Sequence, residues 1–299
     1  MLELLSIGLW PLMLLLPLPL TFDFSSSSSS SPSSNPFHYS RIFPESFLEP
    51  TTASGYTHPL GLILGISAVA IGQFFCILYQ YSHYKIRPII QKAKRPHYSF
   101  AEGVTTHLFQ PEGFLVLGSY LTITWELNLL PPSYYRFDLP TNPLNVALCL
   151  VTVDFLQFLM HQIEHRASPY LYKLSHKPHH RFINPRYFDA FNGSLADTIL
   201  MILIPLLGTA NIVRGCSVWD YMCFGSLYAN WLCLIHCEFT HVWDPVFRLL
   251  GFGTPADHHV HHAYFNFNFG HLFMWWDKLL GTYRSPTSIE AAKKFNKDV

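Results

Sequence analysis

Charged side chains are scarce in this sequence. Asp, Glu, Lys and Arg make up 13% of its 299 residues, whereas they make up about a quarter of an ordinary soluble domain. Acidic and basic residues number 19 each, so no surplus of positive charge indicates a nucleic-acid partner. The composition therefore argues against an ordinary soluble domain and gives no support for nucleic-acid binding.

Cysteines with the paired spacing of a disulfide framework are also lacking. The six cysteines lie within or beside apolar runs, where a free thiol behaves as a small buried hydrophobic group. We therefore expect them to pack in the core rather than to form a disulfide framework. They are Cys76, Cys149, Cys216, Cys223, Cys233 and Cys237.

Apolar residues, by contrast, account for 49% of the chain and gather in five long stretches. A helix of about 20 residues rises about 30 Å, the thickness of the hydrocarbon core of a bilayer. Five such helices are hard to bury without lipid, so the sequence predicts an all-α integral membrane bundle of four to five spanning helices. The last two stretches are so close in sequence that they should form an antiparallel hairpin. The stretches are residues 60–79, 113–130, 144–160, 195–213 and 218–235.

Four regions follow from this pattern. Residues 1–57 combine a leucine-rich leader, which resembles a signal sequence or signal anchor, with a Ser/Pro-rich tract that we expect to be disordered. Residues 58–143 carry the first membrane helices, residues 144–286 form the core that contains the histidine clusters, and residues 287–299 form a tail.

The predicted topology places the histidine clusters on one side of the membrane. A basic run follows the first apolar stretch, and the positive-inside bias assigns it to the cytosol. Counting the crossings from there brings every histidine cluster to that same face. We therefore expect a cytosolic, histidine-rich cap. The basic residues are Lys85, Arg87, Lys92, Lys94 and Arg95.

Histidine is abundant, with 17 copies, and eleven of them stand in four patterned clusters. The two histidines of HQIEH are one helical turn apart, so both leave the same face of a helix. HKPHH and HHVHH share the spacing H-x-x-H-H, and HCEFTH ends the last apolar stretch. The candidate metal ligands are His161, His165, His176, His179, His180, His236, His241, His258, His261 and His262.

So many imidazoles exceed the needs of one metal ion. Zinc takes four ligands, and a catalytic zinc usually takes three protein ligands plus water, so the clusters suit two ions and predict a di-metal cap. Imidazole binds iron, copper or zinc, and the ligand type alone leaves the metal open. Two irons could bind dioxygen and carry out two-electron chemistry, whereas zinc offers hydrolysis or Lewis-acid catalysis.

Two other classes of function remain open at this point. His161, Glu164 and His165 form H-x-x-E-H, the pattern of inverted zinc peptidases, in which the glutamate is the general base. That hypothesis leaves the other three clusters unexplained. A histidine-rich metal transporter would place its histidines along the spanning segments, whereas these lie at the ends of the segments.

The chain resembles the fatty acid hydroxylase superfamily of membrane-bound non-haem di-iron enzymes. The residues that carry the resemblance are the clusters HQIEH, HKPHH and HHVHH and the segment NFNFGHLFMWWDKLLGTYRSP, which begins at Asn266. The similarity covers residues 144–286. It implies an oxidoreductase, a dioxygen-dependent monooxygenase whose two iron ions are held by the histidines. His236 and His241 match the family only loosely.

Four carboxylates are candidates for orienting the metal-bound rings. A ligand imidazole usually donates its outer N–H to a carboxylate, a carbonyl or water, and we expect Asp154, Glu164, Asp257 and Asp277 to serve in this way. Asp154 stands inside an apolar stretch, where an ionisable group is costly and is therefore a functional candidate.

The resemblance also implies a substrate and an electron donor. No glycine-rich nucleotide loop follows a strand and no haem module is fused to the chain, so electrons should come, ultimately from NAD(P)H, through a b-type cytochrome or its reductase. The substrate should be a membrane lipid, either a sterol that is hydroxylated or an isoprenoid precursor such as squalene that is epoxidised. Fatty-acyl or sphingolipid hydroxylation and sterol desaturation are the alternatives. The expected location is the endoplasmic reticulum membrane, as a multi-pass protein.

Overall fold

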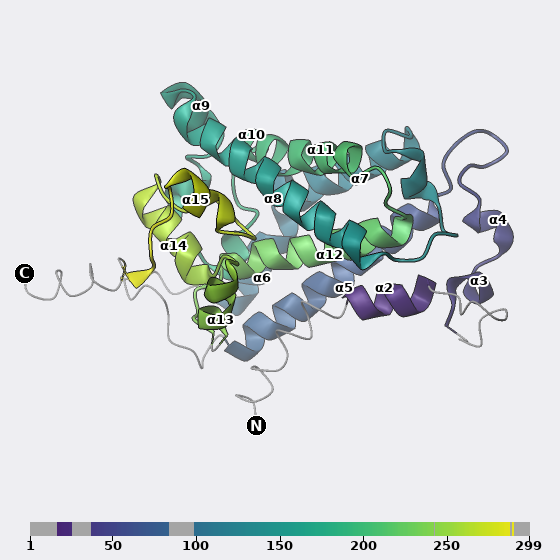
Figure 1. Cartoon of the computed structure of the whole chain (residues 1–299), viewed down its shortest axis with the longest axis horizontal. Coiled ribbons are helices and arrows are strands. Elements are labelled where there is room, and N and C mark those ends of the chain that lie inside the picture. The colour runs from purple at the N-terminus through teal and green to yellow at the C-terminus, as the bar shows by residue number, and fades with distance from the viewer. Residues whose placement is uncertain (1–16, 26–36, 84–98, 242, 288, 290–299) are drawn as a thin grey trace, which may run out of the picture.

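In the computed structural model of the chain, the regular elements of the residues that it describes are helices (Figure 1). The β-type pairings within these residues are isolated bridges, such as the one between Phe252 and Phe273. The prediction of an all-α fold is therefore confirmed. The described residues are 17–25, 37–83, 99–241, 243–287 and 289.

Some of the sequence predictions fall outside the described residues. They are most of the leucine-rich leader at residues 1–16, most of the Ser/Pro-rich tract at residues 26–36, the basic run within residues 84–98, and residues 290–299 of the tail. The short elements that join the main helices are α3 (Tyr39–Ile42), α4 (Glu45–Leu48), α6 (Phe100–Phe109), η2 (Pro132–Tyr135), η3 (His179–Arg181) and η4 (Tyr187–Asp189).

Helix α12 (Val218–Ile235) forms the centre of the bundle. It packs along α5 (Leu60–His83), α8 (Pro143–Arg166) and α2 (Pro17–Ser25), and most of its side chains are buried. Helix α11 (Ile204–Ile212) also packs along α8, and a short turn connects it to α12. The two helices of the predicted hairpin therefore run in opposite directions, and both pack against α8 (Figure 1).

Part of the predicted leader region belongs to the packed fold. Helix α2 lies against α12, and Oγ of Ser25 is 2.9 Å from Oγ1 of Thr141 at the start of α8. Residues 37–57 follow as short turns that carry α3 and α4.

Three of the five predicted stretches are long and apolar enough to cross a membrane. They are Leu60–Ser82, Pro143–Arg166 and Leu195–Ile212. The stretch at 113–130 is divided between the π-helix η1 (Pro111–Leu115) and α7 (Val116–Glu126), which is short for a crossing. Because α12 is mostly buried among other helices, the total of four to five crossings stays a prediction. The rod Leu195–Ile212 consists of α10 (Leu195–Thr198), the π-helix η5 (Ile199–Leu203) and α11.

Asp220 ties the starts of two core helices together. At the start of α12 its carboxylate accepts the Ser217 N–H at 3.0 Å, and Oγ of Ser217 accepts the Asp220 N–H. This capping box satisfies donors that a helix start leaves free. The same carboxylate accepts Asn142 N–H at 2.6 Å and Asn145 Nδ2 at 2.9 Å. The starts of α8 and α12 are thereby fixed side by side, which also aligns their other ends.

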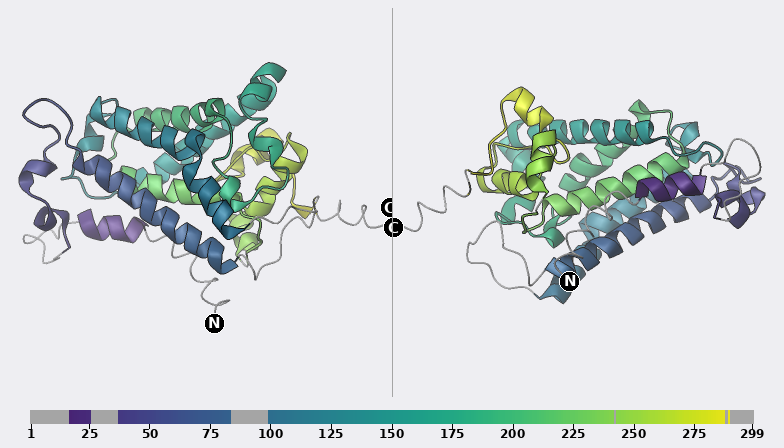
Figure 2. Two further views of the ribbon diagram at one scale, coloured as in Figure 1. Left: turned by 180° about the vertical axis from the view of Figure 1, so that it is seen from behind. Right: turned by 60° about the horizontal axis from the view of Figure 1, so that its bottom comes forward.

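The short helices gather where α8 and α12 end (Figures 1 and 2). They are α9 (Pro169–Leu174), α13 (Asp244–Leu250), α14 (Pro255–Tyr264) and α15 (Trp275–Leu280). The candidate histidines lie in the last turns of α8 or in the segments that follow α8 and α12. One end of the bundle therefore carries the chemistry.

The contact between α5 and α7 leaves no room for a side chain at Gly61. A Cβ there would lie 2.2 Å from Cη2 of Trp125, a buried ring whose Nε1 donates to the His58 carbonyl. Gly61→Ala should therefore lower the free energy of unfolding by about 1–3 kcal/mol, the usual cost of overpacking. Gly118→Ala is the matched control, because a Cβ at Gly118 in α7 meets no atom within 4 Å. Thermal unfolding in detergent should show a lower midpoint for Gly61→Ala alone, and equal midpoints would contradict this packing.

Candidate metal centre

The structure gathers nine of the ten candidate histidines into two groups. Within each group, one ring nitrogen of every histidine lies within 4.8 Å of the others. Eight of the nine rings belong to buried residues, and His165 is partly exposed. The first group is His161, His165, His176, His180 and His261, and the second group is His179, His236, His258 and His262.

Each H-x-x-H-H cluster is shared between the two groups. At residues 176–180 the first and last histidines join the first group, and the middle one joins the second. At residues 258–262 the assignment is reversed. On a helical turn the side chains at i+3 and i+4 lie on the same face as residue i, one to either side of it. One short segment can therefore serve two neighbouring sites, which no single-zinc peptidase motif requires.

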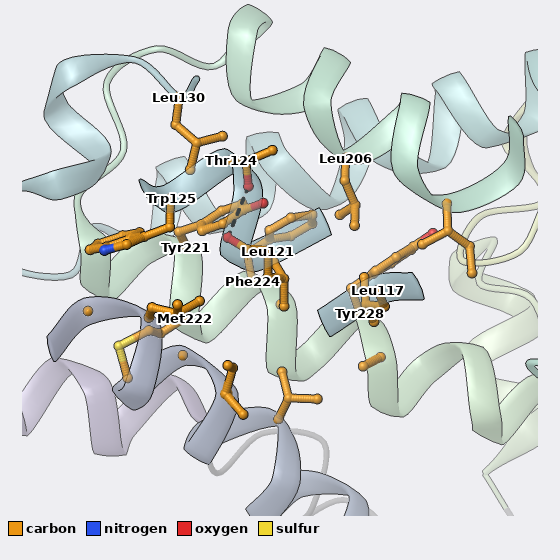
Figure 3. A pocket seen from close by; sticks show the side chains of 18 of the residues that line it. Leu117, Leu121, Thr124, Trp125, Leu130, Leu206, Tyr221, Met222, Phe224 and Tyr228 are labelled. Atoms are coloured by element: carbon orange, nitrogen blue, oxygen red, sulfur yellow. Dashed lines mark hydrogen bonds between the residues drawn. The ribbon is translucent and has the colours of Figure 1, made fainter. Parts of the chain in front are cut away.

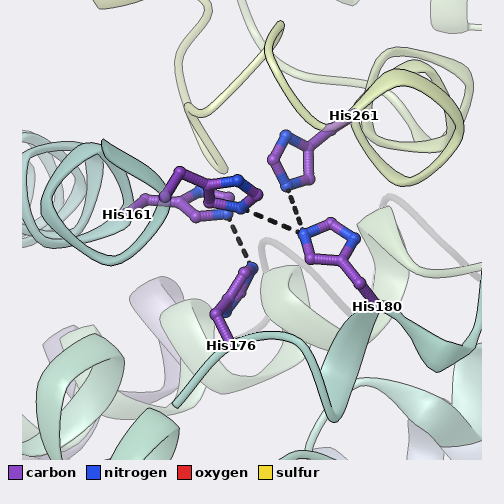
Figure 4. Close-up of side chains that lie close together, drawn as sticks. His161, His176, His180 and His261 are labelled. Carbon is purple, nitrogen blue, oxygen red and sulfur yellow. Dashed lines mark hydrogen bonds between the residues drawn. The ribbon is translucent and has the colours of Figure 1, made fainter. Parts of the chain in front are cut away.

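The ring nitrogens of the first group point toward a common centre (Figure 4). Nε2 of His161 lies 2.9 Å from Nε2 of His176. Nε2 of His180 lies 3.1 Å from that of His165 and 3.0 Å from that of His261. Two nitrogens bound at right angles to one metal ion, each about 2.1 Å from it, stand about 3 Å apart. The observed spacing fits such an ion.

The second group has the same spacing. Nε2 of His236 lies 3.2 Å from Nε2 of His179 and 3.0 Å from Nε2 of His258. Nε2 of His262 lies 3.1 Å from that of His258. Four imidazoles thus converge at this second position, as a second metal ion would require.

The facing nitrogens of His161 and His176 are placed as a shared cation would need them. Nδ1 of His161 lies 2.7 Å from the Phe269 carbonyl oxygen, and Nδ1 of His176 lies 2.7 Å from the Asp197 carboxylate. Because both partners accept, each Nδ1 carries the proton and each neutral ring presents a lone pair at Nε2. Two lone pairs 2.9 Å apart repel each other, whereas a metal ion would bind both. The donor set therefore fits a metal.

Backbone carbonyls orient two further rings. Nδ1 of His236 donates to the Leu232 carbonyl, one turn back along α12, at 2.7 Å. Nδ1 of His261 donates to the Phe267 carbonyl at 2.8 Å. Each contact fixes the tautomer that leaves Nε2 free to bind a metal.

The segment NFNFG, residues 266–270, supplies two of the carbonyls that accept from histidine rings, those of Phe267 and Phe269. Asn268 lies in the left-handed region at φ 53°, which asparagine tolerates better than most residues. Its side chain binds the backbone of α14 and of Arg284. Asp277 accepts the N–H groups of Phe269 and Gly270 at 2.9 and 2.7 Å. With the amides held by Asp277, the carbonyls of residues 267 and 269 face the histidines.

Three of the four candidate carboxylates fix loops of the site. Asp154 accepts the N–H groups of residues 271–273 and an indole N–H, which fills its acceptor positions. Asp257 forms a capping box with Thr254 and so starts α14, the helix with three grouped histidines. Asp277 holds the 269–270 turn. These carboxylates place the segments that carry the rings and their acceptors.

Glu164, the fourth candidate, lies beside an imidazole. Its Oε2 is 3.6 Å from Nδ1 of His176, but Asp197 makes the shorter contact at 2.7 Å. The three side chains form a third compact group. Sequence reasoning missed Asp197, which stands in no histidine motif. The signal that could have found it is the one used for Asp154, a carboxylate inside an apolar stretch.

His241, the tenth candidate, belongs to neither group. The chain leaves α12 at His236 and turns, so five residues later the side chain points elsewhere. The ring of His241 stacks on Trp243 with centroids 5.3 Å apart, and the backbone N–H of His241 donates to the Asp244 carboxylate at 2.8 Å. The spacing in HCEFTH could not reveal this turn.

Two other histidines are buried beside the groups without joining them. Nε2 of His259 lies 3.1 Å from the Cys237 carbonyl oxygen. The ring of His271 stacks on His161 with centroids 5.1 Å apart and lies 5.2 Å from His258. Both support the walls of the site.

Burial keeps the grouped imidazoles neutral. It lowers the pKa of His179 to about 4. It also lowers the pKa values of His176, His258, His261 and His262 well below the usual value, and neighbouring histidines add to these shifts. Since only the neutral ring binds a metal, the site is ready for metal at neutral pH.

Metal-free protein should lose stability as the pH falls from about 6.5 toward 4. In that window the unfolded chain protonates its histidines, while buried His179, with a pKa of about 4, stays neutral. The unfolded state then binds more protons, so stability falls with pH, by up to about 1.4 kcal/mol per pH unit for each such histidine. Thermal unfolding of chelator-treated protein at pH 7.5 and pH 5 measures this, and a midpoint unchanged between them would contradict the burial of neutral rings.

Asp197→Ala should weaken metal binding at the first group about 10- to 100-fold, the usual effect of removing a carboxylate that orients a ligand imidazole. Glu164, 3.6 Å from the His176 ring, is too distant to replace it without movement. Competition of Co²⁺-loaded protein with a chelator measures the affinity. Asp138→Ala is the control, because Asp138 is exposed and paired with Arg136. Equal affinity in the two variants would exclude the role of Asp197.

Comparison with known proteins identifies the family. Residues 146–282 match the family model described as fatty acid hydroxylase, and this range contains both histidine groups. No solved structure matches the chain.

Named relatives agree with this match. The chain is 52% identical over 271 residues to the alternative squalene epoxidase of Phaeodactylum tricornutum. The aligned region covers 89% of this chain and 78% of the relative. It is 29% identical to a Delta(7)-sterol 5(6)-desaturase of Aspergillus fumigatus and 31% identical to a cholesterol 25-hydroxylase-like protein of Danio rerio. It spans 58% and 55% of the length of these two relatives. By the family match and the extent of the first similarity, this chain belongs to the fatty acid hydroxylase superfamily.

Proposed function

We propose that this protein is a membrane-bound di-iron monooxygenase that epoxidises squalene. The observation that carries the proposal is the 52% identity, over 89% of this chain, with a relative named alternative squalene epoxidase. The two groups of converging imidazoles support it, because their number and spacing fit a pair of metal ions.

The reaction transfers one oxygen atom from O₂ to a carbon–carbon double bond. The other oxygen atom leaves as water, which requires two electrons and two protons from outside. A pair of iron ions held by the two groups would supply the electron exchange with dioxygen. We further propose that a b-type cytochrome or its reductase delivers the electrons, ultimately from NAD(P)H.

The chain's own residues hold the nitrogen donors in place and keep water away. The acceptors at Phe267, Phe269 and Asp197 fix the rings of His261, His161 and His176. Because those rings are buried, bulk water has little access to the reacting atoms. Fixed donors in a dry site favour oxygen transfer to an apolar substrate over side reactions with water.

Oxidation of a sterol is a second candidate. Relatives named as a sterol desaturase and as a cholesterol 25-hydroxylase-like protein match 56% and 46% of this chain. Squalene is favoured, because the epoxidase relative is 52% identical and its match covers 89% of this chain.

Two other classes of function, a zinc peptidase and a metal transporter, receive less support. A zinc peptidase would use His161 and His165 with Glu164 as its base, yet three more imidazoles join the same group, and Glu164 lies buried beside His176. A metal transporter would line its spanning helices with ligands, whereas both groups lie at one end of the bundle.

We propose the endoplasmic reticulum membrane as the location, with the histidines facing the cytosol. The sterol-related names of the relatives support the organelle. The basic run between α5 and α6 supports the orientation.

Purified wild-type protein should contain about two irons per chain and should convert squalene to its epoxide with label from ¹⁸O₂. His179→Ala and His261→Ala, which remove one ligand from the second and the first group respectively, should each abolish epoxidation and lower the iron content. Mass spectrometry of the product and elemental analysis of the protein measure the two effects.

His241→Ala is the matched control, because His241 lies outside both groups. It should keep both iron and activity. Full activity in His179→Ala and His261→Ala, or a wild-type protein that contains a single zinc ion, would refute the proposed function.

A further inference from the structure

Two cysteines lie together at the end of the bundle opposite the histidines. Sγ of Cys149, in the second turn of α8, is 3.4 Å from Sγ of Cys216, which directly precedes the Ser217 cap of α12. Both cysteines are fully buried. They stand 67 residues apart in the sequence, so the packing of α8 against the start of α12 is what brings them together.

Hydrogen bonds to two other elements hold the loop that carries Cys216. Nδ2 of Asn145, one turn before the other cysteine in α8, donates to the Gly215 carbonyl at 3.2 Å. The hydroxyl of Tyr134 in η2 donates to the Val213 carbonyl at 2.7 Å. The position of the loop is therefore set by contacts other than the one between the sulfur atoms, and the two thiols stay within reach of each other.

Two of the other cysteines have oxygen partners instead. Sγ of Cys76 donates to Oδ1 of Asn230 at 3.3 Å, and Sγ of Cys233 donates to Oε1 of Gln73 at 3.5 Å. These thiols bind amide oxygens within the bundle. Cys149, by contrast, faces a group with which it can form a covalent bond.

A pair of free thiols gains little from this contact, because S–H is a weak donor and sulfur a weak acceptor. A disulfide bond has a length of about 2.05 Å. To reach it from 3.4 Å, the two sulfur atoms must approach by about 1.4 Å. Small rotations of both side chains cover that distance, and the backbone can stay in place.

The position of the pair relative to the membrane favours oxidation. In the proposed orientation the histidine end faces the cytosol, and α8 is one of the helices long and apolar enough to cross the membrane. The starts of α8 and α12 then face the lumen of the endoplasmic reticulum. Disulfides form and persist in that compartment, whereas thiols in the cytosol are kept reduced.

We propose that Cys149 and Cys216 form a disulfide bond that links the start of α8 to the start of α12. The inference goes beyond the proposed function and takes only the membrane orientation from it. As the S–S bond forms, the two thiols give up two protons and two electrons. The disulfide of a protein thiol oxidoreductase accepts them and becomes two thiols. Because both sulfur atoms are buried in the folded chain, this exchange precedes the final packing of the two helices.

The bond acts on the same junction as Asp220. That carboxylate joins the starts of α8 and α12 through hydrogen bonds, which are lost when the chain unfolds. A covalent link persists in the unfolded chain and lowers its entropy, because it closes a long loop. The disulfide should therefore stabilise the pairing of the two helices whose other ends carry His161, His165 and His236.

Thiol trapping tests the bond in the protein as cells make it. Membranes that contain the full-length protein are quenched with acid, unfolded in detergent with N-ethylmaleimide and digested without a reductant. Mass spectrometry should find the peptides of Cys149 and Cys216 joined, and reduction should separate them. Both peptides carrying N-ethylmaleimide, or either cysteine joined to a different one, would overturn the proposal.

Thermal unfolding measures the stabilisation. Dithiothreitol should lower the unfolding midpoint of the wild type by about 5 °C or more, as the loss of a disulfide in a chain of this size predicts. Cys149→Ala and Cys216→Ala should start from a lower midpoint that dithiothreitol leaves unchanged. Cys223→Ala is the matched control, because Cys223 is equally buried in α12 and lies outside the pair. It should keep the full response to dithiothreitol.

Equal midpoints for the oxidised and the reduced wild type would overturn the link between the helices. If an alanine variant fails to fold, thiol trapping of the wild type decides alone. The two proposals also fail separately. Free thiols in a protein that epoxidises squalene would overturn the disulfide and leave the function standing, whereas a joined pair in a protein that leaves squalene unchanged would do the reverse.

Discussion

The structure depends on one electrostatic constraint, the convergence of neutral imidazole lone pairs in a buried place. Rings such as His161 and His176 face each other at 2.9 Å with their outer nitrogens already committed to acceptors. That arrangement is repulsive unless a cation joins them. Burial removes the alternative of protonating the rings, because it lowers their pKa values, as at His179. Metal binding and the packing of this end of the bundle are therefore coupled.

Most acidic residues of the site act on the backbone. Asp154, Asp257 and Asp277 each gather several donors from loop or cap positions, and the loops then aim carbonyls at the rings. A carbonyl holds a ring with less charge than a carboxylate would. Asp197 instead contacts a ring, at 2.7 Å from Nδ1 of His176, and Glu164 lies 3.6 Å from the same nitrogen. The site thus combines a weakly charged surrounding with a rigid frame, which suits a centre that must accept an apolar substrate.

The position of the metal centre joins two environments. It lies where α8 and α12 end, so polar loops cover one side and the apolar bundle adjoins the other (Figure 1). An apolar cavity lies along α12 (Figure 3), and Leu232, a residue of its lining, accepts Nδ1 of His236 at its carbonyl.

The sequence by itself determined the helical class, the apolar segments and nine histidines that converge, because hydrophobic length and histidine spacing are local properties. It could not divide the histidines between two groups, since that division depends on how the 176–180 loop and α14 pack together. It included His241 because a turn after α12 leaves no trace in residue spacing. It missed Asp197 and the carbonyls of residues 267 and 269, because partners distant in sequence meet only when the chain is folded. The sequence therefore shows which residues can bind a metal, and the tertiary packing decides which of them share a site and which groups orient them.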